Sequence, residues 1–247
     1  MSDPEERALP ITADMLLARR VDFERRMRRF PPVTLGIIAV LVLVYLDESA
    51  RGMLSSARAI VDAGALDRAS VMAGQVWRLF TATLLHGGGD HLFGNAVALY
   101  VLGMVCEHAF GRRQFFVLYV LSGLAGSLVS LLVSPGPSVG ASGAIFGLQG
   151  AAIVLFRQHR DRLLVRDRRI GLVLIVWALY TIATGFGAEY VDNGAHLGGF
   201  LGGLLVGRWL HAVVLEPMPE GAARRVQRWF WLVTAVIAGA TVAWLGH

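Results

Sequence analysis

Seven apolar segments, separated by connections rich in arginine or turn-forming residues, restrict the fold of this chain more than any other feature. They cover residues 33–46, 92–105, 115–133, 140–155, 170–182, 195–215 and 229–245. A helix of about 20 apolar residues crosses a bilayer, and an open sheet cannot satisfy its backbone polar groups in lipid. Since hydrophobic residues make up 55% of the chain and charged residues 17%, we predict an all-α, polytopic membrane helix bundle.

The connections define the expected organisation of the chain. Residues 1–31 contain seven arginines and are expected to form a basic tail, with residues 13–29 either helical on the lipid headgroups or simply solvated. Residues 47–83 mix polar and apolar types and predict a long, partly helical loop at the membrane interface. Residues 32–213 therefore form a six-helix core, and residues 214–247 a linker followed by a seventh membrane helix.

The distribution of basic residues predicts the orientation of the chain. All 23 basic side chains are arginine, and 19 of them fall in alternate connections, on one side of the predicted bundle. These connections are residues 1–31, 112–113, 157–169 and 208–228. Because cytoplasmic loops are enriched in arginine and lysine, the N-terminus is expected to be cytoplasmic and the C-terminus external. The short tail and the absence of a signal-type segment favour a prokaryotic plasma membrane.

Composition also excludes several classes of function. The arginines lie in short clusters between apolar runs, so they do not form the basic patch by which a soluble domain binds nucleic acid. A single cysteine, Cys106, excludes an internal disulfide and argues against a structural zinc site. We therefore expect neither a cofactor nor a metal, and the expected partners are the lipid bilayer and other membrane proteins.

The predicted topology brings several polar residues to one shallow layer near the external face. Ser142 and His196 lie at the external ends of the fourth and sixth segments, and His86, His91 and Asn95 lie around the external end of the second. Polar side chains at such positions are costly and often mark a functional site.

Small residues recur every four positions on both the serine and the histidine segments. They are Gly143, Gly147 and Ala151 on the segment that carries Ser142, and Ala195, Gly199, Gly203 and Gly207 on the segment that carries His196. Such ridges allow two helix backbones to pack closely. Gly199 and Gly203 share the helix face of His196, so the face that carries the histidine is the one that can approach Ser142.

This arrangement permits nucleophilic catalysis. A serine hydroxyl is a weak nucleophile until a base takes its proton, and His196 is the histidine best placed to do so. Asp192 is expected to cap the sixth helix, which favours a dyad over a triad. Backbone amides beside Gly140 and Gly143 could stabilise an oxyanion.

Each of these residues also has an ordinary structural explanation. A serine in a membrane helix commonly bonds its own backbone, a histidine can be a packing group, and Asn95 can join two helices by a hydrogen bond. Their common depth, together with the matching small-residue ridges, favours the catalytic interpretation.

These motifs resemble those of the rhomboid family of intramembrane serine proteases. They are Gly140-Ala141-Ser142-Gly143, Ala195-His196 followed by Gly199 and Gly203, the set His86, His91 and Asn95, and Trp77-Arg78 before it. The resemblance covers residues 33–213 and implies hydrolysis of peptide bonds in or beside the transmembrane segment of a substrate protein. It assigns catalysis to Ser142 and His196, and the oxyanion site to His91 and Asn95.

The resemblance also implies supporting roles for other residues. His86 would assist the site, Phe146 would lie against the base, and Trp77 and Arg78 would be structural. Glu107 would tie the internal end of the second helix to neighbouring loops. The seventh helix is an addition to the six-helix form and is expected to lie outside the active site.

Two functions other than proteolysis are compatible with some of these sequence features. A proteolytically inactive relative that binds membrane clients would typically lack the serine or the histidine, and both are present here. A small-solute transporter could explain intramembrane polar residues and glycine-interrupted helices. It would be expected to show an inverted repeat, which is not visible in this sequence.

Overall fold

The computed structural model describes residues 20–27, 30–185 and 191–247. The regular elements of this part of the chain are all helices, as predicted. They are α2 (Phe23–Arg26), α3 (Pro32–Ala50), α4 (Ala57–Asp62), α5 (Arg68–Met72), α6 (Arg78–Thr81), α7 (Gly89–Phe110), α8 (Arg112–Val133), α9 (Ser142–Gln158), η1 (Arg160–Arg162), α10 (Val165–Gly185), α11 (Asn193–Gly207) and α12 (Glu220–Leu245).

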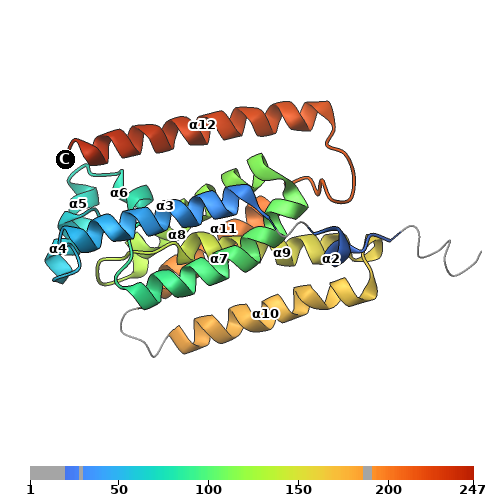
Figure 1. The fold of residues 1–247 in the computed structure, drawn as a ribbon, viewed down its shortest axis with the longest axis horizontal. Helices are drawn as coiled ribbons and strands as arrows, with labels where there is room; N and C mark the ends of the chain where they lie inside the picture. Colours follow the sequence, from blue (N-terminus) through green and yellow to red (C-terminus); the bar gives the residue numbers. More distant parts are fainter. Residues whose placement is uncertain (1–19, 28–29, 186–190) are drawn as a thin grey trace, which may run out of the picture.

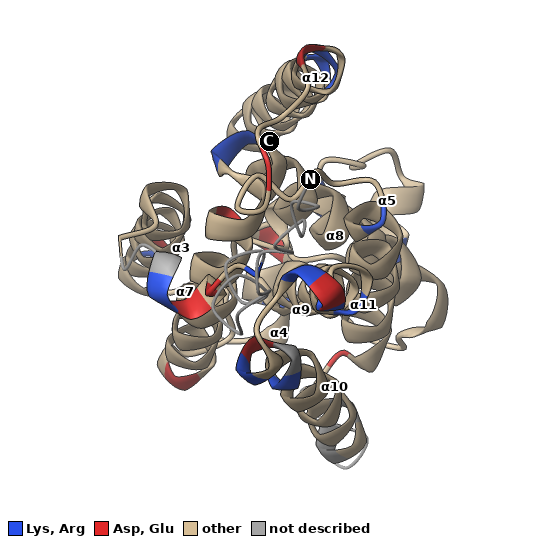
Figure 2. Ribbon diagram, turned by 90° about the vertical axis from the view of Figure 1, so that its right-hand side faces the viewer, with Lys and Arg blue, Asp and Glu red and all other residues tan. Residues whose placement is uncertain are grey.

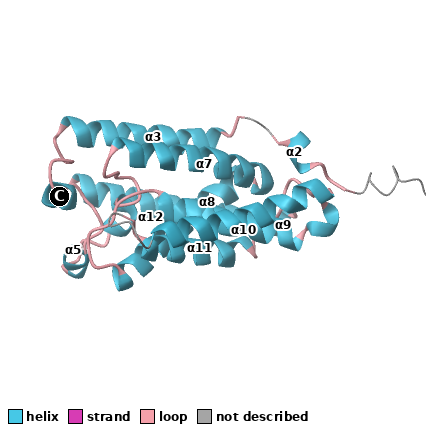
Figure 3. Ribbon diagram, turned by 90° about the horizontal axis from the view of Figure 1, so that it is seen from below, coloured by secondary structure: helices cyan, strands magenta, loops and turns pink. Residues whose placement is uncertain are grey.

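The long helices lie side by side in an elongated bundle, with α12 along one edge and α10 along the opposite edge (Figure 1). Viewed end-on, α9 lies near the centre, with α7 to one side and α11 to the other (Figure 2). Most residues of α9 are buried, and α11 packs most extensively on α8 and α9. The connections gather at the two ends of the bundle (Figure 3).

Each of the seven predicted segments corresponds to one long helix, which confirms a polytopic membrane bundle. Among the described residues, α3, α7, α8 and α12 are long and apolar enough to cross a membrane. The central helices are shorter, because α9 has 17 residues and α11 has 15. At about 1.5 Å per residue, α11 is shorter than a hydrocarbon layer of about 30 Å.

The first membrane helix extends beyond its apolar run at both ends, and a side chain of another helix caps its first turn. The carboxylate of Glu107, in the last turn of α7, accepts hydrogen bonds from the amides of Val33 (3.1 Å) and Thr34 (2.9 Å) and from the Thr34 hydroxyl. Amides in the first turn of a helix have no partner within it. Glu107 therefore joins α7 to the start of α3, and this contact lets α3 begin at Pro32.

The predicted end of the sixth segment was wrong, because α11 stops at Gly207 rather than at residue 215. The apolar residues that follow pack against the ends of other helices. Ala212 is buried, and the amide of Val214 bonds the carbonyl of Ala109. The side chain of Gln114 bonds both the amide and the carbonyl of His211. The hydrophobicity of this run thus reflects tertiary packing.

A continuous helix over residues 13–29 was also a wrong expectation for the described part of that stretch. Only α2 is helical, and the side chain of Phe23 is buried, with its ring edge-on to those of His108 and Phe156. Its amide donates to a carboxylate oxygen of Asp167 (2.9 Å), and Val21 pairs with Leu163 as an isolated bridge. This part of the tail packs on protein rather than on headgroups. Residues 13–19 and 28–29 lie outside the described residues.

Replacement of Glu107 by alanine is expected to destabilise the bundle, because three donors at the start of α3 lose their acceptor. Hydrogen bonds to a charged group are each worth about 1.5–3 kcal/mol, so we expect a loss of about 2 kcal/mol or more. Thermal unfolding in detergent measures the effect. Glu220→Ala, on an exposed helix end, is the matched control. Equal unfolding midpoints for the two variants would contradict the capping role.

Candidate active site

Ser142 and His196 meet where α9 and α11 begin. Ser142 is the first residue of α9, and His196 lies in the first turn of α11. The distance between His196 Nε2 and Ser142 Oγ is 3.0 Å, which is a hydrogen-bond distance. If Nε2 accepts the serine proton, Nδ1 carries the ring hydrogen.

The close packing predicted from the small-residue ridges is confirmed. A Cβ at Gly199 would overlap the carbonyl oxygen of Gly143, and a Cβ at Gly203 would overlap that of Gly147. One turn further along, a Cβ at Gly207 would lie 2.8 Å from Cα of Ala151. The two backbones are therefore in direct contact along three turns, and this contact sets the His196 ring over Ser142.

The imidazole of His196 is oriented by an aromatic ring rather than by a carboxylate. Its ring stacks on that of Phe146, with centroids 4.3 Å apart and planes 20° apart. The buried Nδ1 atom has no hydrogen-bond partner among the described residues. Within the part of the chain that the structure describes, the cluster therefore has the form of a serine–histidine pair without a third member.

Asp192 caps α11, as predicted from the sequence. Its carboxylate accepts hydrogen bonds from the amide of Ala195 (2.9 Å), from the hydroxyl of Ser130 on α8 and from the hydroxyl of Ser134, the residue that follows α8. Burial raises the pKa of Asp192, but these hydrogen bonds outweigh it and hold the pKa below its ordinary value. The aspartate thus ties the first turn of α11 to α8, four residues before His196.

His91 and Asn95 lie against the backbone that leads into Ser142. A Cβ at Gly140, which has φ +125°, would lie 2.7 Å from Cε1 of His91 and 3.5 Å from Nδ2 of Asn95. The backbone there suits glycine, and its lack of a side chain makes room for both residues. Asn95 is buried, and its Nδ2 has no partner among the described residues. Two side-chain donors and the free amides at the start of α9 therefore converge.

His86 is buried behind this layer and contacts a residue that the sequence had not indicated. The edge of its ring faces His91, with centroids 5.1 Å apart. Its amide donates to the carboxylate of Glu48 at the end of α3 (3.3 Å), a side chain that is 1% exposed. Sequence reasoning assigned Glu48 to the first loop. An acid that directly follows an apolar run was the available signal.

Trp77 and Arg78 organise the first loop, residues 51–88, away from the reacting atoms. The guanidinium of Arg78 donates to the carbonyls of Val61 and Ala65 and lies over the Trp77 ring, 4.8 Å from its centroid. Burial lowers the pKa of Arg78, and nearby carboxylates partly offset this effect. The two residues fold the loop on itself.

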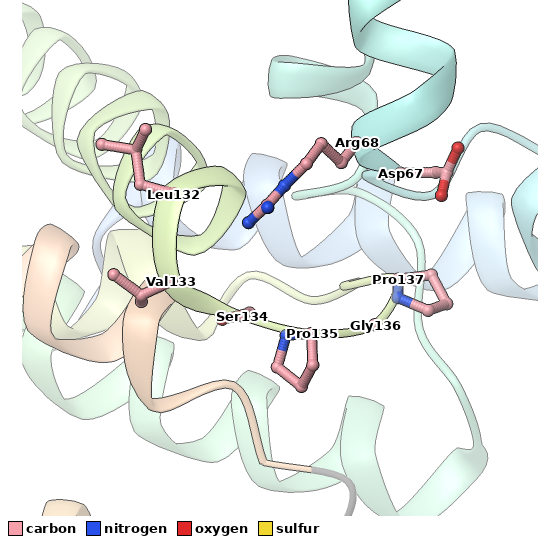
Figure 4. Close-up of a pocket in the computed structure, with 8 residues that line it drawn as sticks. All are labelled: Asp67, Arg68, Leu132, Val133, Ser134, Pro135, Gly136 and Pro137. Carbon is pink, nitrogen blue, oxygen red and sulfur yellow. The ribbon is translucent and has the colours of Figure 1, made fainter.

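A cavity of about 360 Å³ lies beside the connection from α8 to α9. It is lined by Asp67, Arg68, Leu132, Val133, Ser134, Pro135, Gly136 and Pro137 (Figure 4). Arg68 extends from α5 toward the last turn of α8. None of the candidate site residues lines this cavity, so it is separate from the serine–histidine pair.

The fold and this cluster define a polytopic helical membrane protein with a serine–histidine pair between two glycine-lined helices. A family model described as "Rhomboid domain" matches residues 73–213, more than half of the chain. The chain belongs to the rhomboid family.

Curated relatives support this assignment. The chain is 35% identical over 173 residues to "Rhomboid protease GluP" of Bacillus subtilis. The matched stretch covers 70% of this chain and 34% of that protein. It is 44% identical over 148 residues to "RHOMBOID-like protein 5" of Arabidopsis thaliana, a match that covers 58% of this chain and 47% of that protein. It is 34% identical over 130 residues to "Inactive RHOMBOID-like protein 8" of the same plant, a match that covers 51% of this chain and 36% of that protein. The matches span between a third and a half of the length of these relatives.

Gly199→Ala should destabilise the bundle, because the new methyl group would overlap a carbonyl oxygen of α9 and force the helices apart. Overpacking of this kind costs on the order of 1–3 kcal/mol. Gly239→Ala on α12 is the matched control, since nothing lies within 4 Å of its Cβ position, and it should be neutral or stabilising by about 0.5–1 kcal/mol. Thermal unfolding of both variants tests the difference. A Gly199→Ala protein as stable as the control would contradict the backbone contact.

Proposed function

We propose that this protein is an intramembrane serine endopeptidase that hydrolyses peptide bonds in or near the transmembrane segment of other membrane proteins. The observation that supports it most directly is the 3.0 Å contact between His196 Nε2 and Ser142 Oγ. A hydroxyl and an imidazole at this distance can exchange a proton, which is what activates a serine nucleophile.

In the proposed reaction, Ser142 Oγ attacks the carbonyl carbon of the scissile bond while His196 Nε2 takes the hydroxyl proton. The tetrahedral intermediate collapses when the imidazolium gives this proton to the departing amine, leaving an acyl group on Ser142. Water then attacks the ester, with His196 again accepting a proton and returning it to Ser142. The two steps together consume one water molecule and yield an amine and a carboxylic acid, with Ser142 and His196 returned to their starting states.

The negative charge of the intermediate is proposed to be stabilised by His91, Asn95 and the amides at the start of α9. Support comes from the position of His91 and Asn95 against Gly140 and from Nδ2 of Asn95, which has no hydrogen-bond partner among the described residues. A donor that is already bonded in the resting enzyme would have to break that bond first, whereas a free and fixed donor needs no such reorganisation.

In the proposed mechanism, His196 acts as the base without a hydrogen bond from its Nδ1 to a carboxylate. Phe146 holds the imidazole by stacking, and Asp192 is occupied by Ser130, Ser134 and the Ala195 amide. Because no acid of the described residues bonds Nδ1, packing is proposed to orient the ring. The dyad interpretation is therefore favoured over a triad.

A bundle of this kind would act on substrates that reach it from the lipid. A stable transmembrane helix has its carbonyls in hydrogen bonds, so segments with small or helix-breaking residues are the better substrates. From the arginine distribution we propose that the N-terminus is cytoplasmic and that the site opens toward the external face. The relatives include bacterial, plant and Toxoplasma proteins and give no support to the expected prokaryotic membrane.

Labelling with a fluorophosphonate is the sharpest test of the nucleophile. The reagent should modify wild type at Ser142, and both Ser142→Ala and His196→Ala should abolish labelling and cleavage of a test transmembrane segment while folding is retained. Ser49→Ala, an exposed serine of α3, serves as the control. A folded wild-type protein that is neither labelled nor active would favour the client-binding alternative, for which one relative bears the name "inactive".

Asn95→Ala should slow cleavage without abolishing it. Loss of one oxyanion donor costs on the order of 10²-fold in rate, and most of the loss should appear in kcat, because the charge exists only in the transition state. Steady-state kinetics on a transmembrane substrate measures the change. An unchanged kcat would remove Asn95 from the proposed oxyanion site.

A further inference from the structure

The seventh helix packs on α8 near its middle and on the first loop at its C-terminal end, and much of its surface is exposed. Near its middle, the ring of Phe230 packs against that of Phe116 on α8, with centroids 5.5 Å apart. Near its end, the indole nitrogen of Trp244 donates to the carbonyl oxygen of Ala63 in the first loop (2.8 Å). Val233 is its one buried residue in the described chain. Figure 1 shows the last turn of α12 beside α5 and α6.

Several further contacts join the end of α12 to the first loop around Trp244. Gly64, at φ +119°, leaves room for it: a Cβ there would lie 2.8 Å from the indole nitrogen of Trp244 and 3.1 Å from the Trp77 ring. The Trp77 ring also faces that of His247, with centroids 5.6 Å apart. Nε2 of Gln75 lies 3.0 Å from Nε2 of the same histidine.

The same stretch of the first loop is bonded to the segment that leads into Ser142. Leu66 and Ser138 exchange two backbone hydrogen bonds, each of 2.9 Å. The carbonyl of Ala65, the preceding residue, accepts a hydrogen bond from Arg78 (2.8 Å). Two residues after Ser138, the amide of Gly140 donates to the carbonyl of Ala82, again in this loop (2.8 Å).

These contacts form a continuous path from the end of α12 to the start of α9. Trp244 fixes residues 63–64, and the chain continues at once into Leu66, which holds Ser138 four residues before Ser142. The path contains rigid groups and short hydrogen bonds rather than long flexible side chains. A displacement of the loop at Ala63 would therefore be transmitted to Gly140, against which His91 and Asn95 rest.

We propose that α12 is a brace for the first loop, and that Trp244 is a positioning residue that acts through this loop on the segment preceding Ser142. The proposal rests on the proposed function, because it assigns the brace a part in the alignment of the nucleophile. It extends the expectation that the seventh helix lies outside the active site: α12 contributes no group to the reaction but fixes the loop on which the alignment depends.

The test compares Trp244→Phe and Trp244→Ala with wild type, using the full chain in detergent micelles. Trp244→Phe removes the N–H donor but keeps a ring, and it remains informative if Trp244→Ala does not fold. Trp229→Phe and Trp229→Ala are matched controls, since Trp229 is an exposed tryptophan on the same helix. Three quantities are measured: the rate of fluorophosphonate labelling well below the unfolding temperature, the unfolding midpoint, and amide hydrogen exchange in residues 60–70 and 134–141.

We expect Trp244→Phe to label more slowly than wild type by a few-fold and Trp244→Ala by about tenfold, the range that the loss of one hydrogen bond allows. Exchange should accelerate in both segments, including the amide of Ser138, while the Trp229 variants match wild type. A lower unfolding midpoint with unchanged labelling and unchanged exchange at residues 134–141 would show a merely structural anchor and overturn the proposal.

The failure of the proposed function would look different. Wild type would then not be labelled at all, whatever the state of α12. Hydrogen exchange would still decide whether Trp244 restrains residues 134–141, because that measurement does not depend on catalysis. Unchanged exchange there in Trp244→Phe would refute the brace even if the wild-type protein proved to be a protease.

Discussion

Direct backbone contact between α9 and α11 is the constraint on which the rest of this structure depends. Helices in lipid gain little from burying apolar side chains against each other, so their association relies on close packing and hydrogen bonds. Here Gly199 and Gly203 place their Cα atoms against the carbonyls of Gly143 and Gly147. Because there is no side chain between the two backbones, a serine on one helix and a histidine on the other lie at hydrogen-bond distance without long side chains to bridge them.

The surrounding helices preserve this contact and its rotation. Ser130 of α8 and Ser134, which directly follows α8, hold the carboxylate that caps α11, so α11 is held both along its length and about its axis. Glu107 joins α7 to α3 at the other end of the bundle. The helices at the edges, α10 and α12, contribute less to the core, and their exposed apolar side chains suit contact with lipid.

The sequence was sufficient to predict what periodic or local patterns determine. Seven apolar runs gave seven helices, glycine spacing gave the packed faces, and Asp192 could be recognised as a cap because capping involves neighbours in the chain. The end of α11, the burial of Phe23 and the contact of Trp244 with Ala63 could not be predicted. In each of these, a side chain or a backbone group is satisfied by a residue far away in the sequence, for which a hydropathy pattern holds no information.

Buried polar groups in this bundle fall into two sets that differ in their hydrogen bonding. The carboxylates of Glu107 and Asp192 are bonded by several donors, which is the state that minimises the cost of burial. By contrast Asn95 and His196 each keep a buried polar atom without a partner in the described part of the chain. A group left unbonded in a low-dielectric site costs stability, and folding alone gives no reason to retain it. The Asn95 amide lies against Gly140, two residues before Ser142, and the other ring nitrogen of His196 lies at hydrogen-bond distance from Ser142 Oγ. Other buried polar atoms of the described residues also lack a partner, among them the hydroxyls of Tyr119 and Ser122. The missing bonds of Asn95 and His196 therefore support a role in the proposed reaction only in combination with the position of these two residues beside Ser142.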